Sequence, residues 1–190
     1  MHWSIVVDLA IPVAERAALS VEQLGEPMRH MGIGFAAVPT DRVRLILAAG
    51  RLGAEGEMER IDVALSEIAS ATRRFTYRLA APSWHPSQEE ARALVARVNE
   101  GEEQLTQVRL RLSELLGPEL CLTGVEDAGG GAVVLLGTLA DAEHHELRGL
   151  LPSSAADLGS SVVSDLAVVR WTETTGGPKW RVSKRCFLQS

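Results

Sequence analysis

Apolar and polar residues alternate along several short stretches of the chain, and this period of two predicts β-strands. The clearest stretch is residues 42–49, where Arg44, Ile46 and Ala48 share one face of a strand and purely apolar residues share the other. Shorter or less regular stretches of the same kind predict strands at residues 3–9, 33–38, 75–79, 120–125, 132–139, 161–171 and 180–188. The last two stretches flank a Gly- and Pro-containing segment and predict a hairpin.

A second pattern, in which apolar residues recur every three or four positions, predicts amphipathic helices. This spacing predicts helices at residues 13–28, 55–71 and 102–116, and a shorter one at 141–150. Residues 82–87 contain two prolines and are typical of a turn. Residues 91–98 are ambiguous by this criterion, because Ala, Leu, Arg and Glu favour a helix by intrinsic propensity.

The predicted elements repeat along the chain. The strand–helix–strand–helix series that begins at residue 3 is followed, roughly 89 residues later, by a similar series that begins at residue 91. The repeat resolves the ambiguity, because residues 91–98 take the place of the first strand. We therefore predict an α+β fold with approximate repeats at residues 1–88 and 89–190. Residues 1–190 would form one bilobal domain with interleaved lobes, in which two antiparallel sheets face a central cleft and the helices lie outside.

Composition and charge narrow the class of protein. The chain has 190 residues, of which 46% are hydrophobic and 23% charged, and a net charge of −6. These values are ordinary for one globular domain. The negative charge disfavours nucleic acid as a partner without excluding it, because nucleic-acid binding relies on Lys and Arg. No apolar run approaches the ~20 residues of a membrane span, so we predict a cytoplasmic protein without a membrane partner. The oligomeric state stays open.

Few residues suggest metal or cofactor chemistry. Cys121 and Cys186 are far apart and form no C-x-x-C motif, and His144 and His145 are neighbours that point about 100° apart on a helix. We therefore expect no metal site and no cofactor. His85, in S-W-H-P-S, lies where it would border the cleft. It is the best candidate for an acid or base, although a single loop histidine is more often simply exposed.

Several segments, in their order and spacing, resemble the two-histidine (2H) phosphoesterase superfamily, the 2′-5′ RNA ligase-like proteins. The segments are P-T-D-R-V-R-L-I-L-A-A-G-R-L-G before the helix at 55–71, P-S-W-H-P-S-Q before the strand at 91–98, G-E-E-Q-L at the third helix, and the closing V-V-S-D-L-A-V-V-R-W-T-E-T-T-G-G-P-K-W-R-V. The resemblance spans nearly the whole chain, and no single segment is diagnostic.

The resemblance implies a catalytic pattern that this chain lacks. Members of the superfamily carry a His-x-Thr/Ser-x tetrapeptide on each of two central strands, and the two histidines act as general acid and base. The corresponding positions here are residues 44–47 and 133–136, which read R-L-I-L and V-V-L-L. Both histidines and both hydroxyl residues are therefore expected to be absent. The cleft would instead be lined by Arg44, Ile46, Val133 and Leu135.

This substitution argues against phosphodiesterase or RNA ligase activity. Proton transfer near pH 7 needs a group that titrates there, whereas an arginine stays protonated and aliphatic side chains carry no exchangeable proton. One cation beside an apolar wall suits a small amphiphilic or anionic molecule. It is equally consistent with a cleft filled by side chains, in which case a protein partner is favoured. Two alternatives are an enzyme that uses the cleft for other chemistry and a residual cyclic-nucleotide phosphodiesterase.

Overall fold

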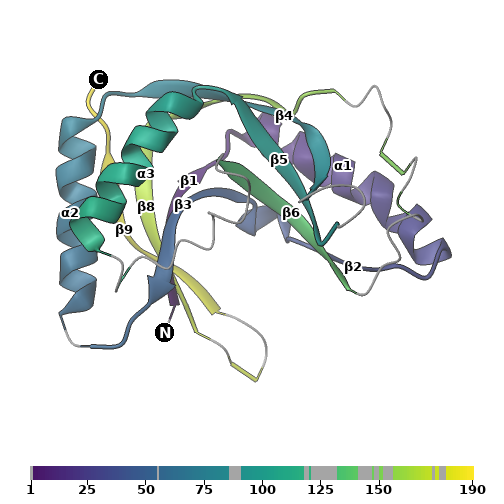
Figure 1. Cartoon of the computed structure of the whole chain (residues 1–190), viewed down its shortest axis with the longest axis horizontal. Coiled ribbons are helices and arrows are strands. Elements are labelled where there is room, and N and C mark those ends of the chain that lie inside the picture. Colours follow the sequence, from purple (N-terminus) through teal and green to yellow (C-terminus); the bar gives the residue numbers. More distant parts are fainter. Residues whose placement is uncertain are drawn as a thin grey trace.

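The structure is a computed structural model that describes residues 2–54, 56–85, 91–117, 120, 132–140, 147, 150–151, 156–172, 174–175 and 179–190. Within these ranges three α-helices cover one curled antiparallel sheet of nine strands (Figure 1). The strands are β1 (His2–Asp8), β2 (Gly34–Ala37), β3 (Arg44–Arg51), β4 (Phe75–His85), β5 (Ala93–Glu100), β6 (Val133–Ala140), β7 (Gly159–Val163), β8 (Asp165–Thr172) and β9 (Lys179–Phe187). The helices are α1 (Ile11–His30), α2 (Glu57–Ala71) and α3 (Glu102–Leu116), and a short 3-10 helix, η1 (Thr40–Arg42), precedes β3.

The order of the strands divides the sheet into two halves. The order is β7-β4-β5-β6-β3-β1-β8-β9, and β2 pairs with the end of β6. One half, from β7 to β6, is contacted by α1, and the other half, from β3 to β9, is contacted by α2 and α3 (Figure 1). The predicted α+β class is confirmed. The two expected sheets are continuous, because the pair Leu45–Val134 joins β3 to β6.

The main core lies between the sheet and the helices. Alternate residues of the strands, such as Ile5, Leu45 and Val134, point to this outer face and are fully buried. They pack in one cluster with the apolar stripes of all three helices, including Leu65 of α2 and Leu105 of α3. Each such leucine contributes roughly 1.5–3 kcal/mol when it leaves water. Within the described ranges, the helices thus occupy one face of the sheet, and no described helix covers the other.

Several predicted boundaries differ from the structure for identifiable reasons. Residues 82–85, predicted as a turn, continue β4, which tolerates Pro82 because the register shifts between Leu79 and Pro82. The single strand predicted at 161–171 is divided at Ser164, where the chain leaves β7 in one half and enters β8 in the other.

Ala48 also lies on the wrong face in the sequence-based prediction. A register shift between β1 and β3 adds a residue to β3, so that Leu47 and Ala48 are both buried in the main core. The strand predicted at residues 91–98, in contrast, is present as β5, shifted by two residues, because tertiary pairing with β4 and β6 overrides the helix propensity of this segment.

Two predicted elements lie largely outside the described residues. These are the strand at 120–125 and the helix at 141–150, of which only Leu120, Leu147 and Leu150 are described. Among the helices that are described, none combines the length and the apolar character that crossing a membrane requires. The predicted duplication and cytoplasmic location remain predictions.

Candidate functional site

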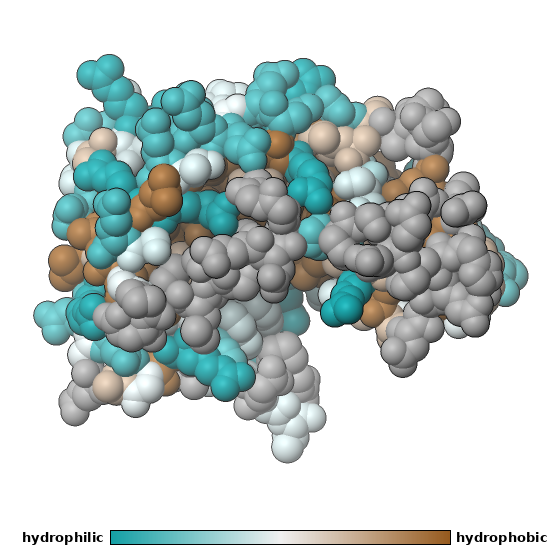
Figure 2. Space-filling view, in the orientation of Figure 1, coloured by the Kyte–Doolittle hydropathy of each residue, from teal (hydrophilic) through white to brown (hydrophobic). Residues whose placement is uncertain are grey.

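The four predicted cleft residues lie around the pair Leu45–Val134, which joins the two halves of the sheet and is called the joint below. Leu45 and Val134 face the main core and form the pair that joins β3 to β6. Because side chains alternate along a strand, Arg44 and Ile46 on β3 and Val133 and Leu135 on β6 point to the opposite, inner face. All four are partly buried. The space-filling view shows the outline of the molecule indented between the two halves (Figure 2).

A small apolar cluster forms part of this inner face. Val6 of β1 and Ala167 and Val169 of β8 are buried there, separately from the main core, and Ile46 packs against them. They are brought together because Val6 pairs with both Ile46 and Ala167. The half of the sheet that carries β3 therefore has apolar side chains on both faces, with helices covering only the outer one.

Next to this cluster, an ionic row crosses four strands. The Nε of Arg44 on β3 donates to Asp8 on β1 at 2.8 Å. Arg185 on β9 reaches over β8 and donates to the other oxygen of Asp8 at 2.7 Å, and it also pairs with Asp165 on β8. The hydrogen bonds that Arg185 donates to Asp8 and Asp165 raise its pKa, so this guanidinium stays charged. The predicted cationic anchor, Arg44, is thus compensated by an aspartate.

His85 lies on the same inner face, in the other half. It ends β4 opposite Ala93 of β5, and the alternate residues of β5 from Ala93 onward share its face. Arg97, two positions beyond Val95, places its terminal nitrogen 3.1 Å from Nδ1 of His85. An arginine can only donate, so Nδ1 accepts and the neutral ring carries its proton on Nε2. Arg97 pairs with Val133, which places this couple beside the joint.

At the far end of the inner face, aromatic rings stack across three strands. The rings of His2 on β1 and Trp171 on β8 have centroids 5.0 Å apart, and those of Trp171 and Trp180 on β9 are 4.8 Å apart with an interplanar angle of 16°. The guanidinium carbon of Arg42 lies 5.5 Å from the Trp180 ring centroid. Such a cation–π contact holds a charge over an aromatic face.

Among the described residues, more positive than negative side chains lie on the inner face, although the chain as a whole is anionic. By register, the described strands place five arginines there (Arg44, Arg51, Arg78, Arg97 and Arg185) against three carboxylates (Asp8, Glu100 and Asp165), and Arg42 adds a further positive charge near Trp180. The net charge of the whole chain is −6. A surplus of positive charge on one concave face concentrates anions there.

Sequence reasoning located Arg44, Ile46, Val133, Leu135 and His85 but missed Arg97 and the partners of Arg44. Arg97 sits at an alternate position of the strand at 91–98, so its face could have been noticed once that segment was assigned as a strand. The pairing of Arg44 with Asp8 depends on the register between β1 and β3, which no local pattern encodes.

No metal site is apparent within the described ranges, where no three His, Cys, Asp or Glu side chains come together as ligands. His144, His145 and Cys121 lie outside those ranges. Of the remaining histidines, His30 is at the end of α1, where its ring contacts the Glu26 carbonyl at 3.0 Å.

Comparisons with solved structures identify the fold. TT0787 of Thermus thermophilus superposes with a TM-score of 0.73 at 20% identity, and Escherichia coli LigT complexed with 3′-AMP superposes with a TM-score of 0.74 at 15% identity; both matches cover 100% of this chain and 98% of the other. Usb1 of Kluyveromyces marxianus gives a TM-score of 0.61 at 13% identity over 95% of this chain and 96% of its own.

These proteins are members of the 2H phosphoesterase superfamily, and this chain has their fold. No protein-family model matches the chain, and a search of curated proteins finds no match.

Proposed function

We propose that this protein is a diverged member of the 2H phosphoesterase fold that binds a small anionic molecule on the inner face and lacks two-histidine phosphoester chemistry. The observation that carries the proposal is the composition of the joint. Arg44, Ile46, Val133 and Leu135 surround it, and none of them titrates near pH 7. Each positioned acid or base contributes roughly 10²–10⁴ to a rate, so losing both removes most of the reaction.

The charges around the joint support an anionic ligand. Arg97 and Arg44 approach it from opposite halves, and the neutral His85 offers an Nε2–H donor beside Arg97. Guanidinium groups bind carboxylates and phosphates through paired hydrogen bonds. The solved structures of Escherichia coli LigT include complexes with ATP, 3′-AMP, NADP+ and phosphate. We therefore take a phosphate-bearing small molecule as the first ligand class to test. The apolar cluster with Ile46 would accept an uncharged part of such a ligand.

The test measures binding and turnover separately. We expect calorimetry to detect 3′-AMP binding that weakens with added salt, because screening reduces attraction between the charges. We expect Arg97→Gln to weaken that binding at least tenfold, and Arg111→Gln, on the exposed side of α3, to leave it unchanged. Asp8→Asn should strengthen 3′-AMP binding, since it frees Arg44 and Arg185 from their shared carboxylate. The same change should lower the free energy of unfolding by about 1 kcal/mol at most, because both pairs are partly exposed.

Turnover distinguishes the alternatives. Incubation with 2′,3′-cyclic AMP should yield no product above the buffer rate. Hydrolysis that disappears in His85→Ala would instead support an enzyme that uses His85 as its acid or base. Unchanged 3′-AMP binding in both Arg97→Gln and Asp8→Asn would contradict a small-molecule role for the inner face and leave a protein partner as the better hypothesis.

A further inference from the structure

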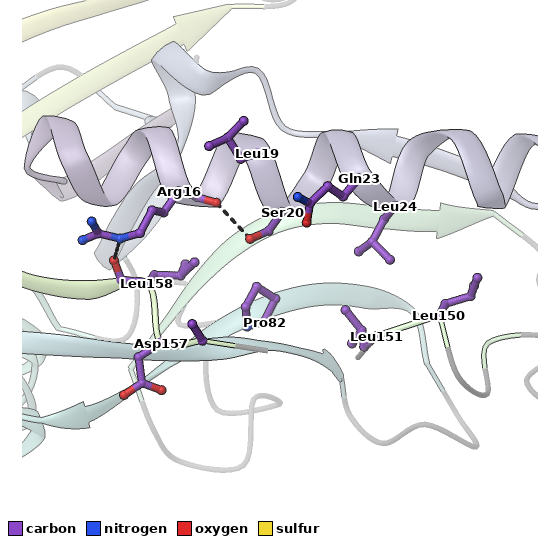
Figure 3. Close-up of a pocket in the computed structure, with 11 residues that line it drawn as sticks. Arg16, Leu19, Ser20, Gln23, Leu24, Pro82, Leu150, Leu151, Asp157 and Leu158 are labelled. Atoms are coloured by element: carbon purple, nitrogen blue, oxygen red, sulfur yellow. Dashed lines mark hydrogen bonds between the residues drawn. The ribbon is translucent and has the colours of Figure 1, made fainter. Parts of the chain in front are cut away.

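Two of the hollows on the surface lie away from the inner face, and they differ in charge. The groove beside α1 contains both signs, because Arg16 and Asp157 line it together (Figure 3). The other hollow, of about 260 Å³, lies where the end of α2, the start of β4 and one face of α3 meet (Figure 1). Among the described residues that line it are Arg73, Arg74 and Arg111, and none is a carboxylate. We call this hollow the arginine pocket.

The arginine pocket has two polar sides and an apolar floor. Four of its lining residues recur at three- and four-residue spacing and so share one face of α3, namely Gln104, Gln107, Val108 and Arg111. Residues 72–74, which link α2 to β4, form the other side. The floor is apolar because Val108 is buried in the main core and Phe75 packs against that core. Charges above an apolar floor interact more strongly than they do in bulk water.

The backbone that carries Arg73 and Arg74 is fixed by hydrogen bonds with Gln189. The Gln189 N–H donates to the Thr72 carbonyl at 3.0 Å, and the Arg74 N–H donates to the Gln189 carbonyl at 2.9 Å. The Gln189 side chain also donates to the Ser70 carbonyl in the last turn of α2. Less ordering of this backbone is therefore required when a ligand binds to the two arginines.

The three guanidinium groups have no counterion within the part of the chain that the structure describes. The side chains of Arg73, Arg74 and Arg111 make no hydrogen bond and no ion pair there. Arg44 and Arg78, in contrast, each pair with an aspartate. The end of α2 contributes only about half a negative charge from its aligned peptide dipoles. Most of the positive charge of the arginine pocket is therefore uncompensated, and it attracts anions.

We propose that the arginine pocket binds a diphosphate group, either as free pyrophosphate or as part of a nucleoside diphosphate. Two linked phosphoryl groups carry about three negative charges near pH 7, which matches three guanidinium groups. Their oxygens point in several directions, so arginines on both sides of the pocket can donate paired hydrogen bonds at once. A planar carboxylate offers one such edge only.

The size of the arginine pocket and its neutral donors agree with this ligand. A volume of about 260 Å³ corresponds to roughly nine waters at ~30 Å³ each, which is room for two phosphoryl groups. The side-chain amides of Gln104 and Gln107 add N–H donors beside the guanidinium groups. None of Arg44, Ile46, Val133, Leu135 or His85 lines this pocket, so the proposal stands independently of the proposed function.

The experiment titrates the full chain with pyrophosphate and follows the side-chain amide signals of Gln104 and Gln107 by NMR. These signals report on the arginine pocket alone, whatever binds on the inner face. We expect pyrophosphate to shift both signals. We also expect added sodium chloride to weaken the binding, because screening reduces the attraction between the charges.

Variants test which arginines bind the anion. Arg74→Gln and Arg111→Gln should each weaken pyrophosphate binding at least tenfold. Arg111→Lys keeps the charge but loses the paired donors, so its affinity should fall between those of Arg111→Gln and the unmodified chain. Arg29→Gln is the matched control, because Arg29 is an exposed arginine of α1 outside the pocket. It should bind pyrophosphate as the unmodified chain does. All three arginines are exposed, and an unchanged urea midpoint checks that each variant is folded.

A series of phosphates tests the ligand class. Orthophosphate and 3′-AMP carry one phosphate each, and both should shift the two glutamine signals with at least tenfold lower affinity than pyrophosphate. Adenosine diphosphate distinguishes the two sources of the diphosphate group. Binding as tight as that of pyrophosphate, or tighter, would assign a nucleoside diphosphate as the ligand, whereas weaker binding would assign free pyrophosphate.

Any of four results would overturn the proposal. They are absence of pyrophosphate-induced shifts in the two glutamine signals, equal pyrophosphate affinity in Arg111→Gln and the unmodified chain, equal losses in Arg29→Gln and Arg111→Gln, and equal affinity for orthophosphate and pyrophosphate. Absence of 3′-AMP binding in calorimetry, with the pyrophosphate-induced shifts retained, would count against the proposed function alone, so the two sites fail separately.

Discussion

Tyr77 is a single residue whose ionisation depends on its burial in the folded chain. It is the only tyrosine of the chain, and its side chain is fully buried on β4. Burial raises the pKa of Tyr77 to about 12; the nearby Ser161 hydroxyl partly offsets the rise, and the nearby charge of Asp8 adds to it. Because no second tyrosine contributes, the ionisation of this one hydroxyl can be followed by absorbance.

We predict that tyrosinate absorbance in the folded protein rises with a midpoint near pH 12, against about 10 in denaturant. Between these values the unfolded chain has lost the proton and the folded chain has kept it. The free energy of unfolding therefore falls as the pH rises from about 10 towards 12, and it is unaffected by this group below pH 10. Tyr77→Phe should remove that part of the pH dependence. A midpoint near 10 in the folded state would mean that the hydroxyl is solvated.

At the same scale, the sequence predicted which residues line the joint but not their electrostatic state. The faces of Arg44 and Ile46 follow from alternation, which is a local property of the strand. The compensation of Arg44 by Asp8 depends on pairing between segments 36 residues apart. The couple of Arg97 and His85 depends likewise on the register between β4 and β5. The face on which a residue lies can therefore be predicted from the sequence, whereas ion pairs between strands can be identified only once the register of the sheet is known.

Among the elements, α3 illustrates a boundary fixed by one glycine. Gly101, between β5 and α3, has a φ of 78°, and a Cβ there would collide with the Thr76 carbonyl oxygen. Gly25 offers the opposite case, because it lies inside α1 and a Cβ added there would meet no heavy atom within 4 Å. The backbone conformation therefore requires a glycine at position 101, whereas Gly25 only lowers the stability of its helix.

We predict that Gly101→Ala lowers the free energy of unfolding by about 2 kcal/mol or more, since left-handed backbone and a steric clash act together. Gly25→Ala should raise it by about 0.8–1 kcal/mol, the usual difference between these residues in a helix interior. Urea denaturation measures both. A destabilised Gly25→Ala would indicate that α1 is not regular around Pro27.

Elements with a long apolar pattern were predicted correctly. The predicted boundaries were wrong where pairing between strands sets the end of an element. The spacing of residues 102–116 predicts the bounds of α3. The extension of β4 through Pro82 and the division at Ser164 are set by which half of the sheet each strand joins. Only the predicted repeat favours a strand over a helix at residues 91–98, and β5 (Ala93–Glu100) confirms a strand in this segment.

On the scale of the molecule, the two halves are joined more by a shared core than by hydrogen bonds. A single pair, Leu45–Val134, connects β3 and β6 in the sheet. The buried cluster, in contrast, runs through both halves and includes Ile5 from one and Leu94 from the other. Continuous packing of this kind favours cooperative unfolding of the halves together.

We predict that Leu45→Ala lowers the free energy of unfolding by about 2–5 kcal/mol, because it leaves a cavity at the joint. Both halves should still unfold in one transition, with tryptophan fluorescence and far-ultraviolet circular dichroism giving the same midpoint. Leu110→Ala is the control, since Leu110 is 59% exposed on α3 and should change stability by no more than about 0.5 kcal/mol. Two separate transitions would show that the halves fold independently.

The stacked pair of Trp171 and Trp180 has an optical consequence. With ring centroids 4.8 Å apart, the electronic transitions of the two indoles couple, and the coupling produces an exciton couplet in circular dichroism. The couplet depends on how β8 and β9 are paired at the end of the inner face. Its intensity therefore reports on the pairing of these two strands without any added label. Occupation of the inner face by a ligand that displaces Arg42 from Trp180 would alter that signal directly.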